Sequence, residues 1–510
     1  MLMNRECKLK LALSEKDFER LYGHMKLAEP KRNRSEKVLK SVYYDTTDLR
    51  FRGLGVTLRV CKDGDSFVQI VRAEAGLENG VSKPIEVEAP VENIKPDLNR
   101  IGDKSLRRKL VKAISGSSLE PAFETLVTRT FYKLEAGDSL VELALDKGEA
   151  RAKRRKTPIR EAELELIKGD PEGMLGVAQE LFAGLAVHLS PTTKAERGYR
   201  LLLKIPDERP EISPAKAGQA DVKRGQRCGV TFAAILRSAG EQITHNRTVV
   251  LEADVAEGPH QLRVGLTRLR AAHRALKPLL DTPAFHQLEN DAHTIARAVG
   301  EVRDADVLIE EIYAPVAGTV LDKQGFDALL SALQAHRAAK QASARLYLRG
   351  DEWSRLLLSL ALWPAALERN HSLQQQSIED YAKQALKKCW KKVANCGRAI
   401  DQLDPEEKHA MRRSLKKLRY LIEFFAPLFP STDVNPFVKQ LKTLQDVFGY
   451  VNDVRTAEQL RTIATEHGEG HDCAVAAGVV LGWHEEKAAE AWTHAQEEWR
   501  RLNSRGRFWV

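Results

Sequence analysis

The hydrophobic pattern of this 510-residue chain changes its period near residue 205, and that change constrains the fold more than any other feature. Before this point, apolar and polar residues alternate in short segments that end at turn residues, whereas beyond residue 225 apolar residues recur at helical spacing. The segment Ile205–Gly218 holds three prolines and no apolar period, which is typical of a linker. We therefore predict an α+β domain over residues 1–203, a linker over 204–224 and an all-α domain over 225–510.

The alternating segments of the first region predict an antiparallel β-sheet. They are Glu6–Leu13, Gly55–Lys62, Phe67–Arg72, Ile85–Val91, Leu140–Asp146 and Ile159–Ile167. Asp63-Gly64-Asp65 predicts a hairpin between the second and the third of these segments. Two helical stretches interrupt the strands: Ser14–Tyr22, in which Ser14 is a capping residue, and Pro171–Leu185.

Alternate residues of a strand share a face, so several strands carry acidic sets on one side. These sets are Glu86 with Glu88, Glu142 with Asp146, and Glu161 with Glu163 and Glu165. In one interpretation this face meets water, and acidic and basic strands pair across it. In the other it lines a closed barrel, where carboxylates hold Mg²⁺ or Mn²⁺ and basic side chains hold phosphoryl oxygens. The pattern alone leaves both interpretations open.

The helical region contains an internal repeat with an offset of 149 residues, the separation of His260 from His409. The segment His260–Arg270 aligns with His409–Arg419. The same offset pairs four further positions: Asn246 with Asn395, Gly300 with Gly449, Val302 with Val451, and Asp304 with Asp453. A single offset over separated landmarks predicts two related helical bundles about a pseudo-twofold axis.

Each copy of the repeat carries a basic stripe along one helical face. The stripe residues are His260, Arg263, Arg270 and Arg274 in the first copy and His409, Arg412, Lys416 and Arg419 in the second, and Lys387 and Lys391 share a face upstream. A solvated helix face usually mixes charges of both signs, whereas gathered cations repel one another. We therefore predict that the stripes bind a polyanion. No nucleophile or acid partner accompanies the two histidines, so we predict no catalysis in this region.

Composition agrees with a polyanionic partner without identifying it, because 80 Lys and Arg stand against 71 Asp and Glu, a formal net charge of +9. Aromatic residues make up only 6% of the chain and are largely absent from the stripes, which disfavours nucleic acid. The six cysteines form no Cys-x-x-Cys pair, which disfavours disulfides and zinc and fits the cytoplasm. The most apolar segment, Leu356–Trp363, is too short to span a bilayer, and we expect no signal peptide.

The duplicated stripe resembles the CHAD family, the conserved-histidine α-helical domain. The shared pattern is His-x-x-Arg-x-x-x-(basic)-x-Leu-Arg, with Asp304 and Asp453 downstream, and the resemblance extends from about Gly225 to the C-terminus. Thr267 departs from this pattern in the first copy. The resemblance implies two pseudo-symmetric bundles whose central basic surface binds inorganic polyphosphate.

The first region resembles the CYTH superfamily of triphosphate tunnel metalloenzymes over about residues 3–203. The segments that carry the resemblance are Glu6–Lys10, Tyr43–Thr46, Leu58–Arg59, Val141–Asp146, Glu161–Glu165 and Lys194–Tyr199. The resemblance implies an eight-stranded antiparallel tunnel that binds a triphosphate, in which metal-activated water attacks a terminal phosphorus. With both regions considered, the chain is similar to the bacterial CYTH–CHAD proteins typified by inorganic triphosphatases.

Matched by position, the resemblance implies three sets of site residues. The metal ligands for Mg²⁺ or Mn²⁺ would be Glu6, Glu88, Glu163 and Glu165, with Glu142 and Asp146 as further candidates. The phosphate-binding residues would be Lys10, Arg59, Arg72, Arg129, Arg151, Lys194 and Arg197. The catalytic residues would be Lys10, Arg59 and Glu165.

Two positions depart from the CYTH pattern, and they leave two functions open. Lys8 replaces the second glutamate of Glu-x-Glu-x-Lys, and Cys61 replaces the second arginine of Leu-Arg-x-Arg. One function is metal-dependent hydrolysis of inorganic tripolyphosphate, with polyphosphate bound by the helical domain. The other is a tunnel without turnover in a non-enzymatic polyphosphate-binding or targeting protein. No obvious aromatic clamp for a base is present, which favours the inorganic compound over a nucleotide.

Overall fold

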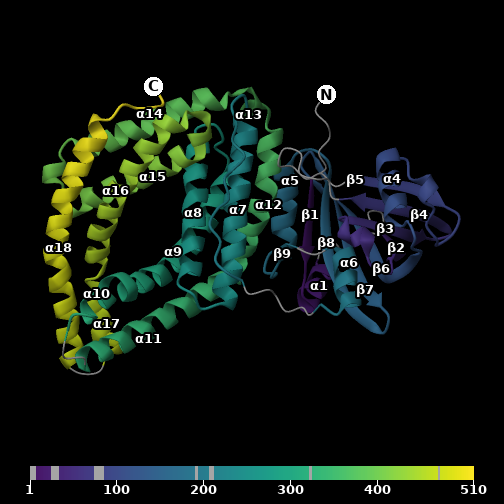
Figure 1. The fold of residues 1–510 in the computed structure, drawn as a ribbon, viewed down its shortest axis with the longest axis horizontal. Coiled ribbons are helices and arrows are strands. Elements are labelled where there is room, and N and C mark those ends of the chain that lie inside the picture. Colours follow the sequence, from purple (N-terminus) through teal and green to yellow (C-terminus); the bar gives the residue numbers. More distant parts are fainter. Residues whose placement is uncertain are drawn as a thin grey trace. The chain divides into compact units, whose positions relative to one another are not determined.

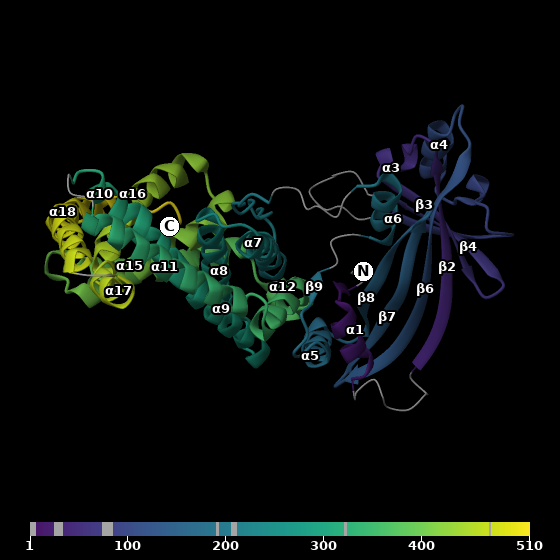
Figure 2. The same ribbon diagram turned by 90° about the horizontal axis from the view of Figure 1, so that it is seen from below.

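The structure is a computed structural model that describes residues 7–24, 34–73, 85–189, 193–205, 212–320, 324–468 and 471–510. The chain forms two compact units, Met1–Glu211 and Ile212–Val510, which Figures 1 and 2 show from two directions. The first unit contains an antiparallel sheet and short helices, and the described regular elements of the second are helices. The predicted α+β and all-α classes are therefore confirmed. Among the described residues, no helix has both the length and the apolar character needed to cross a membrane.

Nine strands form the sheet in the described residues, in the order β5-β4-β3-β2-β6-β7-β8-β1-β9, with all neighbours antiparallel. They are β1 (Lys8–Ala12), β2 (Arg34–Thr46), β3 (Val56–Asp63), β4 (Ser66–Ala73), β5 (Ile85–Val91), β6 (Leu119–Ala136), β7 (Ser139–Ala152), β8 (Arg155–Lys168) and β9 (His188–Leu189). The count exceeds the implied eight strands because the short β9 pairs with β1. In the described part of the chain, β5 and β9 each have one strand neighbour, so hydrogen bonds there do not close the sheet into a tunnel.

The six predicted strands, the hairpin and both predicted helices of this unit are present in the structure. The helix α1 (Glu15–Tyr22) begins as predicted at Ser14, whose hydroxyl accepts a hydrogen bond from the Asp17 amide at 3.1 Å. The helix α5 (Pro171–Leu181) ends earlier than predicted because the chain turns before Gly184, which has a φ of 69°. Several further elements were not predicted, among them β2, β6, β9, α3 (Arg50–Gly53), α4 (Lys104–Ala113) and α6 (Lys194–Leu203).

The strand register places charged side chains on one side of the sheet, which we call the charged face. Arg129 pairs with Asp146 across β6 and β7, and Asp146 pairs with Glu161 across β7 and β8. Lys10 of β1 pairs with Glu163 of β8. The charges that seemed scattered along the sequence are therefore neighbours across the strands, and Figure 2 shows the long strands that bring them together curving along their length.

The two sides of the sheet are covered by different helices. On the side away from the charged face, Leu58 and Val60 are buried with Leu106 and Leu110 of α4. On the charged face, α6 packs through Ala195 and Tyr199 against Tyr43 and Phe123, whose rings lie 4.4 Å apart. This apolar contact positions α6 so that its first turn reaches the charged side chains of the strands.

The helices of the second unit reproduce the repeat found in the sequence. They are α7 (Cys228–Glu252), α8 (Glu257–Leu276), α9 (Pro283–Val307), α10 (Ala314–Ala317), α11 (Gln324–Tyr347), α12 (Asp351–Arg369), α13 (His371–Gln375), α14 (Ile378–Gly397), α15 (Pro405–Phe425), α16 (Ser431–Thr456), α17 (Gln459–His467) and α18 (His471–Ser504). Shifted by 149 residues, α8 would span 406–425 and α9 would span 432–456, which agrees with α15 and α16 to one residue. A reciprocal capping box between Asp404 and Glu407 fixes the start of α15.

Part of the predicted linker, residues 206–211, lies outside the described residues, and the part from residue 212 onward contacts α7. The fully buried Asn246 of α7 accepts a hydrogen bond from the Ala215 amide at 3.1 Å and donates one to the Ala215 carbonyl at 2.8 Å. The Ser238 hydroxyl donates to the Gly218 carbonyl at 2.7 Å. These contacts give the repeat landmark Asn246 a structural role.

Candidate functional site

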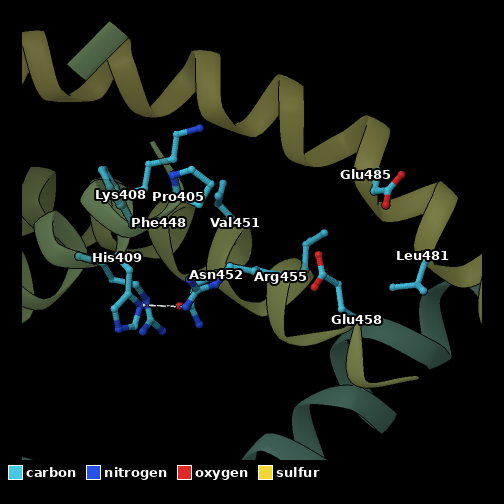
Figure 3. Close-up of a pocket in the computed structure, with 12 residues that line it drawn as sticks. Pro405, Lys408, His409, Phe448, Val451, Asn452, Arg455, Glu458, Leu481 and Glu485 are labelled. Carbon is cyan, nitrogen blue, oxygen red and sulfur yellow. Dashed lines mark hydrogen bonds between the residues drawn. The ribbon is translucent and has the colours of Figure 1, made fainter. Parts of the chain in front are cut away.

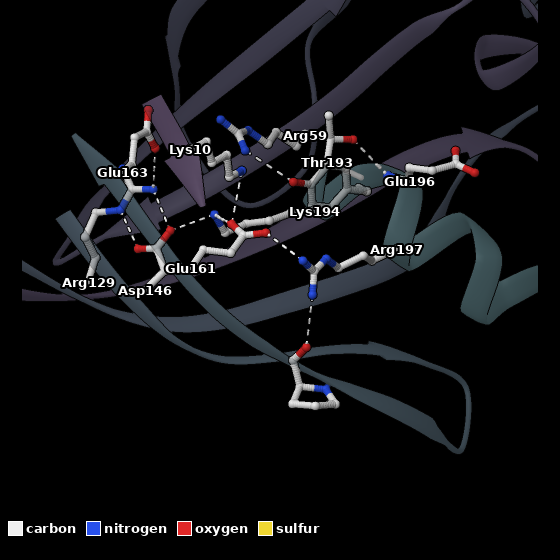
Figure 4. A network of polar contacts seen from close by, with 12 residues as sticks. Lys10, Arg59, Arg129, Asp146, Glu161, Glu163, Thr193, Lys194, Glu196 and Arg197 are labelled. Carbon is white, nitrogen blue, oxygen red and sulfur yellow. Dashed lines mark hydrogen bonds and ion pairs between the residues drawn. The ribbon is translucent and has the colours of Figure 1, made fainter. Parts of the chain in front are cut away.

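A network of ion pairs lies on the charged face around Asp146 and Glu161, each of which is 1% exposed (Figure 4). Arg129 donates two hydrogen bonds to Asp146, from Nε to Oδ1 at 2.6 Å and from Nη2 to Oδ2 at 2.7 Å. Lys194 Nζ bridges the two acids, at 2.6 Å from Asp146 Oδ2 and 2.7 Å from Glu161 Oε2. Three strands and one helix thus meet at a pair of buried carboxylates.

Two more cations surround the same carboxylates. Lys10 Nζ lies 3.0 Å from Glu161 Oε2, and Arg197 Nη2 lies 3.2 Å from Glu161 Oε1. Glu163 Oε2 lies 3.6 Å from Arg129 Nη2 at the edge of the network. The structure therefore brings together four of the seven predicted phosphate-binding residues. Glu161 is not among the site residues that the resemblance implies, although its strand position beside Glu163 places it on the same face.

The network holds its carboxylates in the ionised state. Burial alone would raise the pKa of Asp146, but the hydrogen bond from Arg129 and the charge of Lys194 keep it below the usual value. Burial opposes ionisation of Glu161 in the same way, and the charges of Lys194 and Lys10 overcome it, so its pKa is also lowered. Burial and the neighbouring Lys194 lower the pKa of Lys10. These acids act as fixed charges, because neither is protonated near neutral pH.

Arg59 is a predicted cation of this face with spare hydrogen-bonding capacity. Its side chain is half-buried, and Arg59 Nη1 donates to the Tyr43 hydroxyl at 3.2 Å. The Tyr43 phenol raises the pKa of Arg59 against the effect of burial. Within the residues that the structure describes, no carboxylate lies within 4.0 Å of its guanidinium nitrogens. A guanidinium without an acidic partner is suited to bind a phosphate group.

The predicted metal ligands are brought together only in part. Glu163 and Glu165 alternate along β8 and lie on the charged face, whereas Glu88 lies on β5 at the far end of the strand order. Glu6 lies outside the described residues. Glu165 Oε2 is 3.4 Å from Lys8 Nζ. No group of three or more acidic, histidine or cysteine side chains in the described part of the chain is arranged to hold a metal ion. Two carboxylates fit one Mg²⁺ if phosphate and water oxygens complete its coordination.

The other two predicted phosphate-binding residues, Arg72 and Arg151, lie on opposite sides of the sheet. Arg72 pairs with Thr57, two residues from Arg59 on β3, so it lies on the charged face, where it is exposed. Arg151 does not belong to the site. It is five residues from Asp146 on β7 and therefore points to the opposite side of the sheet, where it forms an ion pair with Glu149. This prediction was wrong because it ignored the strand period.

In the helical unit, cations of the two repeat copies converge where α8 meets α15. Burial and the charges of Arg412 and Arg263 lower the pKa of Lys416 to about 7. His260 is half-buried, and burial with the charge of Arg303 lowers its pKa. The repulsion felt by Lys416 shows that the two basic stripes lie within electrostatic reach of each other.

Other members of the stripes are placed differently. Arg270 and Arg274 both contact Glu289 Oε1, at 3.0 and 3.3 Å. Lys387 and Lys391 are exposed on α14. A further set of cations was not predicted: burial lowers the pKa of Lys417, and the charges of Lys392, Arg274 and Lys388 add to this effect. A helical wheel of α15 that also considered Lys417 would have indicated this second basic edge.

A cavity of about 220 Å³ opens beside the second stripe, between α15, α16 and α18 (Figure 3). Its apolar wall includes Phe448, Val451 and Leu481, and its polar lining includes His409 and Arg412 together with Lys408, Asn452 and Arg455. His409 Nδ1 lies 3.0 Å from Asn452 Oδ1, which fixes the orientation of the imidazole ring. The cavity therefore shares two predicted polyanion-binding residues with the stripe.

Comparison with known families assigns a domain to each unit. Residues 3–199 match the model of the CYTH domain, and residues 234–462 match the model of the CHAD domain.

Two individual proteins are similar to parts of the chain. The inorganic triphosphatase of Haemophilus influenzae is 25% identical over 204 residues, which cover 39% of this chain and 56% of that protein. The chain thus spans about half the length of this relative. The crystal structure of the CHAD domain from the plant Ricinus communis aligns with 58% of this chain and 98% of its own, at 24% identity and a TM-score of 0.51. The similarity to the Ricinus communis domain concerns the fold alone.

Proposed function

We propose that this chain, a CYTH domain joined to a CHAD domain, is a hydrolase that cleaves inorganic tripolyphosphate to diphosphate and phosphate. The observation that carries this proposal is the charged face, where basic side chains from β1, β6 and α6 gather around buried carboxylates and Arg59 of β3 lies on the same face. The likeness to the inorganic triphosphatase of Haemophilus influenzae supports the same substrate. The CYTH domain would carry the reaction.

The proposed reaction divides the charged residues into two roles. Arg59, Lys10 and Arg129 would donate hydrogen bonds to phosphate oxygens, and the buried acids would keep the cations oriented. The oxygen of a water molecule attacks the terminal phosphorus and releases one proton to the solvent, the bond from this phosphorus to the bridging oxygen breaks, and diphosphate leaves. The basic side chains stabilise the negative charge that develops on the bridging oxygen.

Glu163 and Glu165 would hold a Mg²⁺ or Mn²⁺ ion. When bound, such an ion neutralises phosphate charge and lowers the pKa of a coordinated water. Lys8 competes for Glu165, because its ammonium group already lies 3.4 Å from that carboxylate. We therefore expect the metal to bind together with the substrate, whose oxygens supply further ligands.

Phosphate release from tripolyphosphate by the purified full chain tests this proposal. We expect release with Mg²⁺ or Mn²⁺ to exceed that in a chelator at least about tenfold, since a bound ion would neutralise phosphate charge at Glu163 and Glu165. Glu165→Gln should remove this activity. Glu149→Gln is the matched control, because Glu149 lies on the opposite side of β7 and should leave the rate unchanged. Equal release by the parent and by Glu165→Gln would refute the role of Glu165, and no metal-dependent release by the parent would refute the hydrolase.

A second candidate function is binding of triphosphate without turnover. The ion pair between Lys8 and Glu165 favours it, because a lysine satisfies a carboxylate that a metal ion would otherwise need. In this case titration calorimetry would detect tripolyphosphate binding, and no metal ion would produce phosphate release. Calorimetry and the phosphate-release assay can be carried out on the same protein preparation, so together they distinguish the two candidate functions.

For the CHAD domain we propose binding of inorganic polyphosphate. Arg263 of α8 and Arg412 of α15 lower the pKa of the half-buried Lys416 together with burial, and a grouping of cations of this kind is stabilised by a bound polyanion. Polyphosphate supplies dense negative charge and needs no aromatic partners for stacking.

The affinity for polyphosphate should depend on pH through Lys416. With a pKa of about 7 in the free protein, Lys416 is mostly charged at pH 6 and mostly neutral at pH 8. A polyanion favours the charged form, so affinity should fall by about tenfold over this range. The charges that act on Lys416 are Arg412, Arg263 and Arg419, opposed by Asp453. The variant Lys416→Arg stays charged over this range and keeps the histidines, so its affinity for polyphosphate should change less with pH than that of the parent. An identical pH dependence of the affinity in the parent and the variant would contradict this role of Lys416.

A further inference from the structure

The two copies of the repeat differ in how their cations are paired. In the first copy, Arg263 Nη1 lies 2.6 Å from Asp304 Oδ1. Arg270 and Arg274 share Glu289, at 3.0 and 3.3 Å. Each arginine of the first stripe therefore already has a hydrogen-bonded carboxylate, and an incoming anion would have to compete with it.

The corresponding cations of the second copy are paired more loosely. Arg412 Nη2 lies 4.0 Å from Asp453 Oδ1, beyond hydrogen-bond distance. Arg419 Nη1 lies 3.4 Å from Glu423 Oε1, a neighbour on its own helix. No ion pair within 4.0 Å involves Lys416 in the described ranges. The two copies hold the same formal charge in these groups, but the second leaves its cations available.

Glu423 stands in place of Arg274, so the second copy lacks that cation and pairs Arg419 with the carboxylate at this position. Three other differences at equivalent positions favour the second copy. They are Val438 in place of Glu289, Lys416 in place of Thr267, and Gln445 in place of Ala296. The first removes the carboxylate that pairs with two arginines, the second adds a cation, and the third adds an amide donor on α16. In the first copy the Thr267 hydroxyl donates to the carbonyl of Arg263 at 2.8 Å, so it is already engaged.

Buried donors without acceptors lie on α15 and α16 of the second copy. Arg412 Nε, Arg419 Nε and Gln445 Nε2 are all buried and have no hydrogen-bond partner within the described part of the chain. Buried N–H groups in folded proteins nearly always have an acceptor. A phosphate oxygen would supply one to each of these groups, and neither the first stripe arginines nor Ala296 presents a comparable set.

We infer that polyphosphate binds on the second copy, through Arg412, Lys416, Arg419 and Gln445, and that the first copy contributes little affinity because its arginines are held by Asp304 and Glu289. This inference rests on the proposed polyphosphate binding of the CHAD domain and assigns it to one half of a pseudo-symmetric pair. Gln445 would donate a hydrogen bond to a phosphate oxygen and so add affinity without changing the net charge of the site.

Equivalent arginines of the two copies provide a matched test with the full chain and long-chain polyphosphate. Arg419→Ala should raise the Kd at least about tenfold, which corresponds to about 1.4 kcal/mol. Arg270→Ala, at the equivalent position of the first copy, should change it less than about twofold. Gln445→Ala leaves the net charge unchanged and should still weaken binding several-fold. Thermal unfolding of each variant shows whether it is folded.

The possible results separate the inference from the function on which it rests. If Arg270→Ala weakens binding as much as Arg419→Ala, both copies contribute and the inference is wrong, although the CHAD domain still binds polyphosphate. If the parent chain does not bind polyphosphate, the proposed function of the CHAD domain itself fails. If Arg419→Ala is unfolded, the Kd of Gln445→Ala tests the inference instead. An unchanged Kd for Gln445→Ala would overturn the assignment of binding to the second copy.

Discussion

Replacement of Arg59 by alanine should lower kcat/KM for tripolyphosphate by about 100-fold or more, the effect typical of removing one preorganised donor from a site that stabilises developing charge. Arg59 stands out because its hydrogen bond is to the neutral Tyr43 hydroxyl, at 3.2 Å, while Lys10 and Arg129 are already committed to carboxylates. The substrate would be its main ionic partner. Arg59→Lys should recover only part of the rate, because an ammonium group loses the two-pronged geometry of guanidinium.

Steady-state kinetics of Arg59→Ala and Arg151→Ala check this prediction together. Arg151 lies on the other side of the sheet and pairs with Glu149, so Arg151→Ala should keep the parent rate. If both variants lose activity equally, the loss reflects general charge or folding, and the assignment of the charged face as the reaction site fails.

Lys194→Met should lower the stability of the CYTH domain by about 3–5 kcal/mol, the cost of leaving a buried ion pair with one partner. The Lys194 side chain is 12% exposed, and its removal leaves Asp146 and Glu161 with less compensation at exposures of 2% and 1%. For a domain of this size the loss corresponds to a fall of about 6–20 °C in the unfolding midpoint. Scanning calorimetry of the full chain measures it.

Lys147→Met provides a matched control for this prediction. Lys147 Nζ lies 2.6 Å from Glu19 Oε1, the same distance as Lys194 from Asp146, but its side chain is 58% exposed. An exposed pair contributes about 0–1 kcal/mol, so the midpoint should fall by less than a few degrees. Similar shifts for both variants would mean that burial does not set the strength of the network.

Where a local pattern determined the structure, the sequence was sufficient to predict it. The alternation in Ile85–Val91 corresponds to β5, and the repeat offset corresponds to the bounds of α15 and α16. By contrast, β2 was not predicted because Arg34–Val38 are all exposed, so no apolar period marks the strand. Its place in the sheet depends on pairing with β3 and β6, which is a long-range property.

The sequence allowed us to predict which types of residue form the sites, but not the residues with which each of them forms ion pairs. The position of Arg151 could have been corrected from the sequence, since a residue five positions from Asp146 lies on the other side of a strand. The pairing of Arg270 with Glu289 could not have been predicted from the sequence, because Glu289 lies on α9 and a helical wheel describes one helix at a time. Whether a basic stripe is available to a ligand depends on the neighbouring element, and that information appears only in the folded chain.

The ion pairs between α6 and the strands make this part of the CYTH domain sensitive to acid. Because the pKa values of Asp146 and Glu161 are lowered in the folded chain, their contribution to stability is complete above the ordinary carboxyl range and disappears as the pH falls. Once both carboxyls are neutral, Lys10, Lys194 and Arg197 repel one another. Acid would then detach α6 while the hydrogen bonds among the strands persist, and unfolding of this domain would begin with the helix.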